Sequence, residues 1–546
     1  MTSSHPTHLQ TVVAYHERTK HHYHRMARSS GFMDWANQPA PFRRYAGTDE
    51  TVLPLAASDP ELEYSALFAA PGTTAAPLNK AGLAAFLELS LGLSAWKAIG
   101  DDRWALRINP SSGNLHPTEA YLLTARLDDL ADGLFHYNPE AHALERRIAL
   151  PAAAGEMLAA HLESPGFFVA LSSVVWREAW KYGERGFRYC QHDVGHALAA
   201  LSFAARLQGW RIQALAGVGE DGLERLLGFD RTRWHPLEEE TPEVILQVNP
   251  STAPRPKRTL SPEVIDAVAA APIRGHPNQL SPERRRWDII HAVAAATRQI
   301  AVDGGSGGPP ALVPAPEGPP GIKAAEVIRR RRSAVAFDRN GRMDRDTFLQ
   351  LIARTLPAPE CPPFDIDGDR PRISLLLFVH QVVELPPGIY MFIRHPAHHD
   401  DLRSKCDPAL AWQPVAADLP LYQLREGDYR MIAADLACRQ EIAGASVFAL
   451  AMLAAFESAL RDAPWRYRRL FWEAGQIGQI LYLEAEARGY RGTGIGCYFD
   501  DPVHDLIGID GHDWQDLYHF TVGLPFEDPR LQTFPPYAHL SNANRA

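Results

Sequence analysis

The stretch DVGHALAALSFAARLQGWRIQALAGVGEDGLERLLGFD, residues 193–230, returns as EAGQIGQILYLEAEARGYRGTGIGCYFDDPVHDLIGID, residues 473–510. The two copies align without a gap. Nine positions are identical, among them Gly195/Gly475, Leu201/Leu481, Ala205/Ala485, Gly209/Gly489, Arg211/Arg491, Leu226/Leu506, Gly228/Gly508 and Asp230/Asp510. A repeat of this length indicates that one structural unit occurs twice. The chain is therefore expected to consist of two related halves.

Each copy of the repeat opens with a predicted long helix. Leu201 and Ala205, like Leu481 and Ala485, recur at four-residue spacing, which places each pair on one helix face. Small side chains on such a face permit close helix packing. Each helix is expected to end at a Gly in a left-handed cap, followed by a loop and a short second helix.

Strand-like segments occur in both halves. GLFHYNP and GIYMFIRHP form a second related pair, in which Gly133 matches Gly388 and Phe135 matches Tyr390. Aromatic and β-branched content predicts further strands at 120–125, 168–171, 243–248, 373–379 and 519–523. The sequence therefore predicts an α+β fold of two tandem domains that pack as an internal pseudo-dimer.

Gly and Pro divide the chain at residues 303–321, DGGSGGPPALVPAPEGPPG, which predicts an interdomain linker. Two helices are expected in the connector before it, packed on the surface. The expected organisation is an N-terminal extension (1–80), a first domain (81–250), a connector (251–322), a second domain (323–530) and a C-terminal tail (531–546).

Composition excludes several classes of protein. The chain has 46% hydrophobic and 22% charged residues, with a net charge of −10 and no long basic stripe, so nucleic acid is not an expected partner. No apolar run reaches the ~18 residues of a membrane helix. The five cysteines lack CxxC spacing, HExxH is absent and no signal peptide is present, so we expect no metal, no membrane and a cytoplasmic location.

The segment richest in chemistry is RINPSSGNLHPTEAY, residues 107–121. It predicts a turn-rich loop that leads into a strand. Two hydroxyls, one carboxamide and flexible backbone amides lie within five residues, and such a loop can hydrogen-bond the heteroatoms of a flat heterocycle. A well-capped turn without a ligand is the alternative.

The order Pro-Ser-Ser-x-Asn, then Pro, resembles the flavin loop of the nitroreductase superfamily. PSSGNLHPTEAYL is similar to its SagB-type branch, the azoline dehydrogenases of peptide natural-product pathways. KYGERGFR (181–188), GHALAAL (195–201) and TVGLP (521–525) agree, and the resemblance covers about 80–230 and 323–530. It implies bound FMN, with loop ligands Pro110, Ser111, Ser112, Gly113 and Asn114.

IRRRRSAVAF, residues 328–337, resembles the superfamily's phosphate motif, in which a basic residue, a Ser and a second basic residue alternate. Arg331 and Ser333 match, but Val335 stands at the second basic position. A phosphate dianion needs several charge-assisted donors. The candidate substitutes are Arg332, Arg330 and Arg530. Without the resemblance, such an Arg run is typical of a solvated helix end.

In this superfamily one subunit supplies the phosphate motif and the other supplies the flavin loop. The first half has only FRRY at 42–45, without a Ser, where a phosphate motif would stand. The corresponding loop of the second half, 356–372, has no Ser or Asn. The resemblance therefore implies one composite FMN site per chain and a degenerate mirror-image site. It also places the loop with Gly494, Ile495 and Gly496 beside the flavin ring, where glycines permit close approach.

Lys181 and Tyr182 are the expected catalytic pair. In the azoline-oxidising relatives, a Lys-Tyr pair assists proton removal while the flavin accepts hydride. A lysine serves as a base only where desolvation or a neighbouring cation lowers its pKa. A solvent-exposed Lys at the end of an aromatic-rich helix is the alternative.

Three functions remain open from the sequence. The first is an FMN-dependent dehydrogenase of a peptide or other small, azoline-like substrate. The second is an NAD(P)H-dependent nitro or quinone reductase; the absence of GxGxxG is compatible with it, because this fold admits nicotinamide only transiently. The third is a scaffold subunit without cofactor. Because the fusion already buries the surface that homodimers use, we expect a monomer or a loose homodimer.

Overall fold

The computed structural model describes residues 7–69, 72, 74–162, 164–254, 259–300, 318–358, 361–366, 370–461 and 463–540. Most of the predicted linker at 303–321 lies outside the described residues, as do the ends of the predicted N-terminal extension and C-terminal tail.

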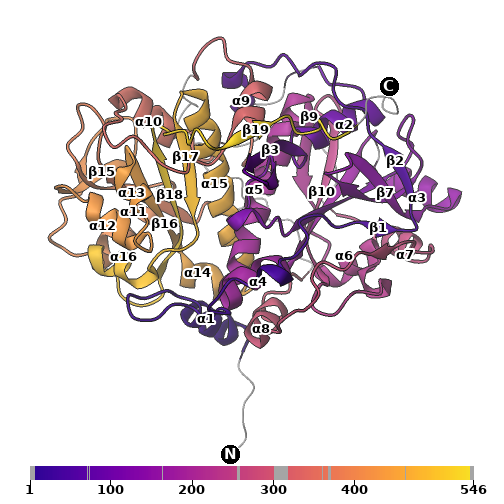
Figure 1. The fold of residues 1–546 in the computed structure, drawn as a ribbon, viewed down its shortest axis with the longest axis horizontal. Coiled ribbons are helices and arrows are strands. Elements are labelled where there is room, and N and C mark those ends of the chain that lie inside the picture. Colours follow the sequence, from indigo (N-terminus) through magenta and orange to yellow (C-terminus); the bar gives the residue numbers. More distant parts are fainter. Residues whose placement is uncertain are drawn as a thin grey trace, which may run out of the picture.

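Two seven-stranded antiparallel sheets share one strand order except at the first edge strand, which comes from a different place along the chain in each sheet. The first runs β2 (Asp49–Val52), β7 (Ala143–Ala149), β6 (Gly133–Asn138), β5 (Thr118–Thr124), β8 (Phe167–Val174), β10 (Glu240–Pro250), β9 (Trp210–Ala214). The second runs β14 (Gln413–Pro414), β15 (Leu421–Glu426), β13 (Gly388–Phe392), β12 (Ile373–Val379), β16 (Phe448–Ala455), β18 (Trp514–Gly523), β17 (Arg491–Ile495). Figure 1 shows one sheet in each half of the molecule. The predicted combination of helices and sheets is confirmed, and one sheet in each half is compatible with the predicted tandem arrangement.

Two long helices, α5 (Gly186–Leu207) and α15 (Arg466–Ala487), lie between the sheets and pack on each other (Figure 1). They meet at Gly195 and Gly475, which occupy the same position of the repeat. A Cβ on Gly195 would lie 2.3 Å from the carbonyl oxygen of Trp472, and a Cβ on Gly475 would lie 2.3 Å from that of His192. The glycines therefore set the distance between the two halves.

The segments after these helices correct one expectation. The predicted left-handed caps are present, with φ of 67° at Gly209 and 77° at Gly489. However, each cap leads into an edge strand and not a loop, so Gly494 and Ile495 lie in β17. Backbone pairing with β18 holds this glycine-rich strand, because ladder hydrogen bonds outweigh the low strand propensity of Gly.

The remaining elements surround the two sheets. The helices are α1 (His8–Arg18), α2 (Lys80–Glu88), α3 (Ala152–Leu162), α4 (Val175–Tyr182), α6 (Glu220–Leu227), α7 (Pro262–Ala269), α8 (Asp288–Ala296), α9 (Ala324–Arg330), α10 (Arg345–Ala353), α11 (His398–Lys405), α12 (Arg430–Leu436), α13 (Glu441–Ala445), α14 (Phe456–Leu460) and α16 (Asp500–Ile507). The remaining strands are β1 (Tyr45–Ala46), β3 (Leu93–Ile99), β4 (Asp102–Arg107), β11 (His276–Pro277) and β19 (Gln532–Phe534).

The connector carries the two expected helices, α7 and α8, but they are not simple surface elements. Val264 and Val268 of α7 are buried in the core of the first half, and Val293 of α8 is fully buried. Their apolar faces explain this position, because both helices are amphipathic and need a core to cover one side.

The chain termini are exchanged between the halves. Helix α1 packs against the second half, where His16 Nε2 lies 3.1 Å from Gln515 Oε1. Strand β19 crosses to the first half and pairs with β3 (Figure 1), and Tyr537 Oη accepts a hydrogen bond of 2.9 Å from the backbone N–H of Leu93. The terminal segments therefore fasten the two halves together.

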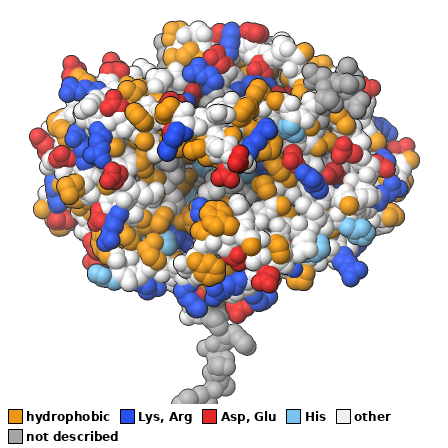
Figure 2. Space-filling model, viewed as in Figure 1, with side chains coloured by type: hydrophobic (Ala, Val, Ile, Leu, Met, Phe, Trp, Pro, Cys, Tyr) orange, Lys and Arg blue, Asp and Glu red, His pale blue; other side chains and the backbone are white. Residues whose placement is uncertain are grey.

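The surface agrees with the composition. Acidic and basic side chains alternate over the face shown in Figure 2, without a continuous patch of one sign. Within the described residues, none of the helices has the length and apolar character needed to cross a membrane.

Replacing Gly195 with Ala tests the helix contact. We expect Gly195→Ala to lower the free energy of unfolding by about 1–3 kcal/mol, because the new methyl group overlaps the backbone of α15. The matched control is Gly222→Ala in α6, where a Cβ meets its nearest neighbour at 3.4 Å and Ala favours the helix by up to about 1 kcal/mol. Urea unfolding measures both; equal effects would contradict the role of the Gly195 contact.

Candidate active site between the halves

The predicted flavin loop lies between β4 and β5 and is held by its own side chains. Gly113 and Asn114 have φ of 61° and 59°, in the left-handed region that Gly and Asn tolerate best. Asn114 Nδ2 donates to the carbonyl oxygen of Ala105 at 2.9 Å, and Ser111 Oγ accepts from the backbone N–H of His116 at 2.8 Å. Turn chemistry therefore fixes the loop backbone in a defined conformation.

The end of α4 brings the predicted catalytic pair onto this loop. A Cβ on Gly113 would lie 2.7 Å from Tyr182 Oη and 3.2 Å from Lys181 Nζ, so the ends of both side chains lie directly on Gly113. Burial, followed by the nearby Glu178, raises the pKa of Tyr182 well above its ordinary value, so this phenol stays protonated at neutral pH. The structure thus joins two motifs that lie far apart in the sequence.

Two buried carboxyl groups lie behind the loop. Asp193 Oδ1 accepts a hydrogen bond of 3.2 Å from the backbone N–H of Ser112, and burial raises the pKa of Asp193 to about 7. Burial, then the charge of Asp193, raises the pKa of Glu178, while Lys181 opposes this shift. Sequence reasoning missed both residues, because each is an ordinary polar position on its own helix.

Tyr482 of α15 connects the predicted ligands of the second half. Its Oη lies 2.9 Å from Ser333 Oγ and accepts the backbone N–H of Gly494 at 2.9 Å. The guanidinium of Arg331 lies 5.1 Å from the centre of the Tyr482 ring. Arg331 Nη2 also donates a hydrogen bond of 3.2 Å to the carbonyl oxygen of Arg107, which belongs to the first half.

Tyrosines also pack closely on the glycines near the end of β17. A Cβ on Gly494 would lie 2.0 Å from Tyr518 Oη, and a Cβ on Gly496 would lie 2.0 Å from the ring of Tyr189. Tyr189 Oη donates to the carbonyl oxygen of Gly496 at 2.9 Å, and its ring lies 4.3 Å from that of Tyr182. These contacts connect the second half with the predicted catalytic pair.

Cationic side chains gather beside Ser333. Burial and the neighbouring Arg331 lower the pKa of Arg332 to about 10, and burial followed by the charge of Arg332 lowers that of Lys97. Arg491 belongs to the same electrostatic group. Lys97 carried no sequence signal, whereas Arg491 was visible only as a conserved position of the internal repeat.

The other predicted ligands differ in their surroundings. Ile495 is buried in the core of the second half, and Pro110 is partly buried in the loop. Arg530 is exposed, and its guanidinium donates to Asp528 at 2.8 Å. Among the described residues, no hydrogen bond or ion pair joins Arg530 to the other predicted ligands. Val335 is exposed, in agreement with its mismatch to the phosphate motif.

The mirror-image position is built differently. Glu473 corresponds to Asp193 in the repeat and likewise accepts a backbone N–H from the loop before a central strand, that of Arg372 at 2.8 Å. Glu473 also forms an ion pair with the buried guanidinium of Arg394. A charged pair therefore takes the place that the hydroxyl-rich loop has in the first half.

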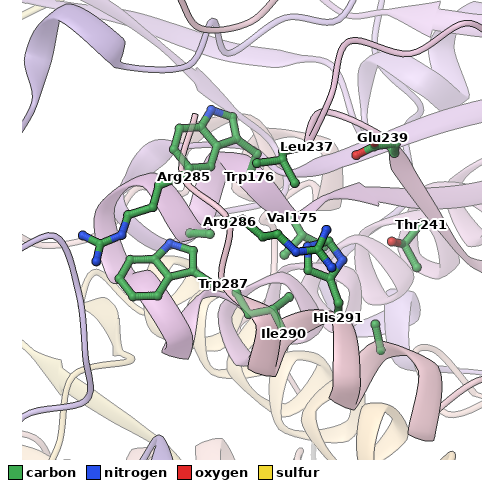
Figure 3. Close-up of a pocket in the computed structure, with 12 residues that line it drawn as sticks. Val175, Trp176, Leu237, Glu239, Thr241, Arg285, Arg286, Trp287, Ile290 and His291 are labelled. Atoms are coloured by element: carbon green, nitrogen blue, oxygen red, sulfur yellow. The ribbon is translucent and has the colours of Figure 1, made fainter. Parts of the chain in front are cut away.

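A cavity of about 330 Å³ lies at the other end of α4. Figure 3 shows Trp176 and Trp287 at its sides, with Arg285 at its edge. Trp176 Nε1 donates to Ser281 Oγ at 2.8 Å, which holds this indole in place, and the guanidinium of Arg285 lies 4.3 Å from the Trp287 ring. The cavity is thus apolar inside and basic at its rim.

No group of three or more His, Cys, Asp or Glu side chains within the described ranges is arranged to hold a metal ion.

Comparisons with known proteins give the class first. Residues 76–237 match the model of the Nitroreductase family, which supports the resemblance at the level of the superfamily.

More particular relatives agree with this class. The chain is 32% identical over 116 residues to a candidate nitroreductase of Methanocaldococcus jannaschii; the alignment covers 20% of this chain and 57% of that protein. A solved structure from Anabaena variabilis, also described as a candidate nitroreductase, covers 94% of this chain and 99% of its own, with a TM-score of 0.69 and 22% identity. The complete two-sheet architecture therefore has a solved counterpart.

The pKa of Asp193 predicts a pH effect on stability. Asp193 holds its proton up to about pH 7 in the folded protein but only to about 3.8 when exposed. The contribution of protonated Asp193 to the stability of the fold is therefore present in acid and is lost as the pH rises through 7. Asp193→Asn should remove this loss. The free energy of unfolding of the variant, relative to that of the unsubstituted protein, should therefore rise by on the order of 1 kcal/mol or more between about pH 4 and pH 7.

Urea unfolding at both pH values measures the effect. The measurement near pH 4 is the internal control, because folded Asp193 is protonated there and most of the loss in stability has not yet occurred. Parallel pH profiles for the two proteins would contradict the assignment.

Proposed function

We propose that this chain is an FMN-dependent oxidoreductase with one composite flavin site between its halves, working as a monomer or a loose homodimer. The observation that carries the proposal is the continuous set of contacts between the two halves. It starts where Lys181 and Tyr182 contact the flavin loop and continues through Tyr189 to Gly496. It also includes the contacts of Tyr482, which lead to Arg331.

The residues present fit such a cofactor. Among the described residues, the buried Arg331 Nε and Asn109 Oδ1 have no hydrogen-bond partner, so each can bind a polar ligand. Arg331 and Ser333, with the surrounding cations, would hold the phosphate, while the flavin loop and Gly496 would hold the ring. Bound FMN would supply hydride transfer.

The protein's own groups would handle the proton. Because Tyr182 stays protonated, it serves as a hydrogen-bond donor that orients the substrate. Lys181, next to it at the loop, is the group that we assign to proton transfer, through Nζ. The buried Asp193, whose pKa of about 7 leaves it partly ionised at neutral pH, lies behind the pair and can hold that proton until solvent removes it.

The SagB-type resemblance favours a peptide or other small, azoline-like substrate, because aromatising an azoline requires removal of both a hydride and a proton. The cavity beside Trp176 offers an apolar space for a neighbouring part of such a substrate. The match to the Nitroreductase family also supports a second candidate function, reduction of nitro compounds or quinones with NAD(P)H as transient reductant.

Flavin content tests the composite site. The purified protein should release one FMN per chain, measured by absorbance of the flavin after denaturation. Ser112→Ala with Asn114→Ala, and separately Arg331→Ala with Ser333→Ala, should each abolish binding, because each removes donors from one side. Arg530→Ala should retain the flavin, since Arg530 is exposed and paired with Asp528. Two FMN per chain would overturn the single site, and none after reconstitution would favour a scaffold subunit.

The catalytic pair separates the two candidate reactions. Lys181→Met and Tyr182→Phe should keep the flavin but slow oxidation of an azoline peptide by about 10²–10⁴-fold, because proton transfer loses its positioned groups. Steady-state rates with the azoline peptide and, separately, with NADPH and a quinone measure this. Loss of only the quinone reaction would assign the site to the reductase function.

A further inference from the structure

Two cysteines meet beside the proposed flavin site. Cys497 directly follows Gly496, and Cys438 lies in the segment after α12. Two hydrogen bonds fasten these segments together. The backbone N–H of Phe499 donates to the carbonyl oxygen of Leu436 at 2.8 Å, and Gln440 Nε2 donates to that of Cys497 at 3.1 Å. The backbone on both sides of each cysteine is thus fixed relative to the other.

The thiols themselves are in contact. The Cys438 and Cys497 side chains lie close enough that each shifts the pKa of the other, and the His21 side chain acts on the pKa of Cys497. His21 Nδ1 accepts the backbone N–H of Ala27 at 2.9 Å, which leaves Nε2 as the protonated nitrogen of the neutral imidazole. This arrangement orients an imidazole on one member of the pair only.

The Cys438 segment is unusual in its backbone. Cys438 and Arg439 have φ of 54° and 60°, in the left-handed region that residues with a side chain rarely adopt. Such conformations cluster at functional sites. Both cysteines are partly exposed to solvent. An open cavity of about 1030 Å³, lined in part by Tyr23, Asp435 and Arg439, lies next to this turn.

We propose that Cys438 and Cys497 form a redox-active thiol pair whose substrate is a low-molecular-weight disulfide. The Cys497 thiolate attacks one sulfur of the substrate, forming a mixed disulfide and releasing one thiol. Cys438 then attacks Cys497, releasing the second thiol and closing a Cys438–Cys497 disulfide. The two cysteines lose two electrons and two protons, which the substrate gains as two thiols. This activity does not depend on the proposed flavin function.

The charges around the pair favour Cys497 as the attacking group. The effect of the neighbouring Cys438 side chain outweighs burial and lowers the pKa of Cys497 to about 5, with His21 and Arg185 acting in the same direction. The pKa of Cys438 is raised. Asp500 opposes ionisation of Cys438, and it is itself paired with Arg185 at 2.9 Å. At neutral pH Cys497 is thus the thiolate and Cys438 the thiol.

The test uses the full-length reduced protein with Cys361→Ser, which removes the other partly exposed thiol; Cys190 and Cys406 are buried. Dithiobis(nitrobenzoate) should release two equivalents of aryl thiolate per chain. Peptide mass spectrometry should find a Cys438–Cys497 disulfide. The first release should change by less than about threefold between pH 6 and pH 8, whereas a thiol of ordinary pKa gains more than about tenfold.

Two further variants assign the roles. Cys438→Ser should release one equivalent and keep the aryl adduct on Cys497, and Cys497→Ser should lose the fast release. Circular dichroism confirms that both variants are folded. An adduct that persists on Cys497 in the presence of Cys438, or an undiminished fast release from Cys497→Ser, would overturn the proposal.

Discussion

The structure depends on the contact between α5 and α15 at Gly195 and Gly475. Without Cβ atoms the two helices approach until backbone meets backbone, which larger residues would prevent. Because both glycines occupy the same repeat position, the contact lies where the two halves are equivalent. It brings α5 against the second sheet, so that His192 stacks on Tyr518 at 4.2 Å. The contacts around the site follow from this separation.

A buried ion pair and the exchanged terminal segments then keep the two halves in one relative position. Burial alone would raise the pKa of Asp500, but the guanidiniums of Arg185 and Arg188 lower it to about 2, so it is ionised and bound to the other half. A buried ion pair adds little net stability, although removing one partner is costly. Its main effect is to specify one relative position of the two halves. Helix α1 and strand β19, which lie near opposite ends of the chain, then fasten the halves in that position.

Sequence predicted the elements better than their contacts. The segment 373–379 coincides with β12, and the repeat correctly gave both long helices and their Gly caps. Gly494 was assigned to a loop because the strand propensity of a residue carries no information about pairing with a distant strand. The predicted loop ligands and catalytic pair do lie together. Asp193 and Lys97 were missed because their roles come from burial and neighbouring charges, which only the folded chain supplies.

Fusion of two related halves into one chain explains why the two positions differ. In a symmetric homodimer every substitution occurs at both sites, so a ligand and its mirror image must both tolerate it. Here Asp193 holds the loop through the Ser112 N–H, whereas its counterpart Glu473 pairs with the buried Arg394. One sequence could not satisfy both environments. A single chain can therefore keep a hydroxyl-rich loop in one half and stabilise the other with an ion pair, while the shared helix contact preserves the geometry of both.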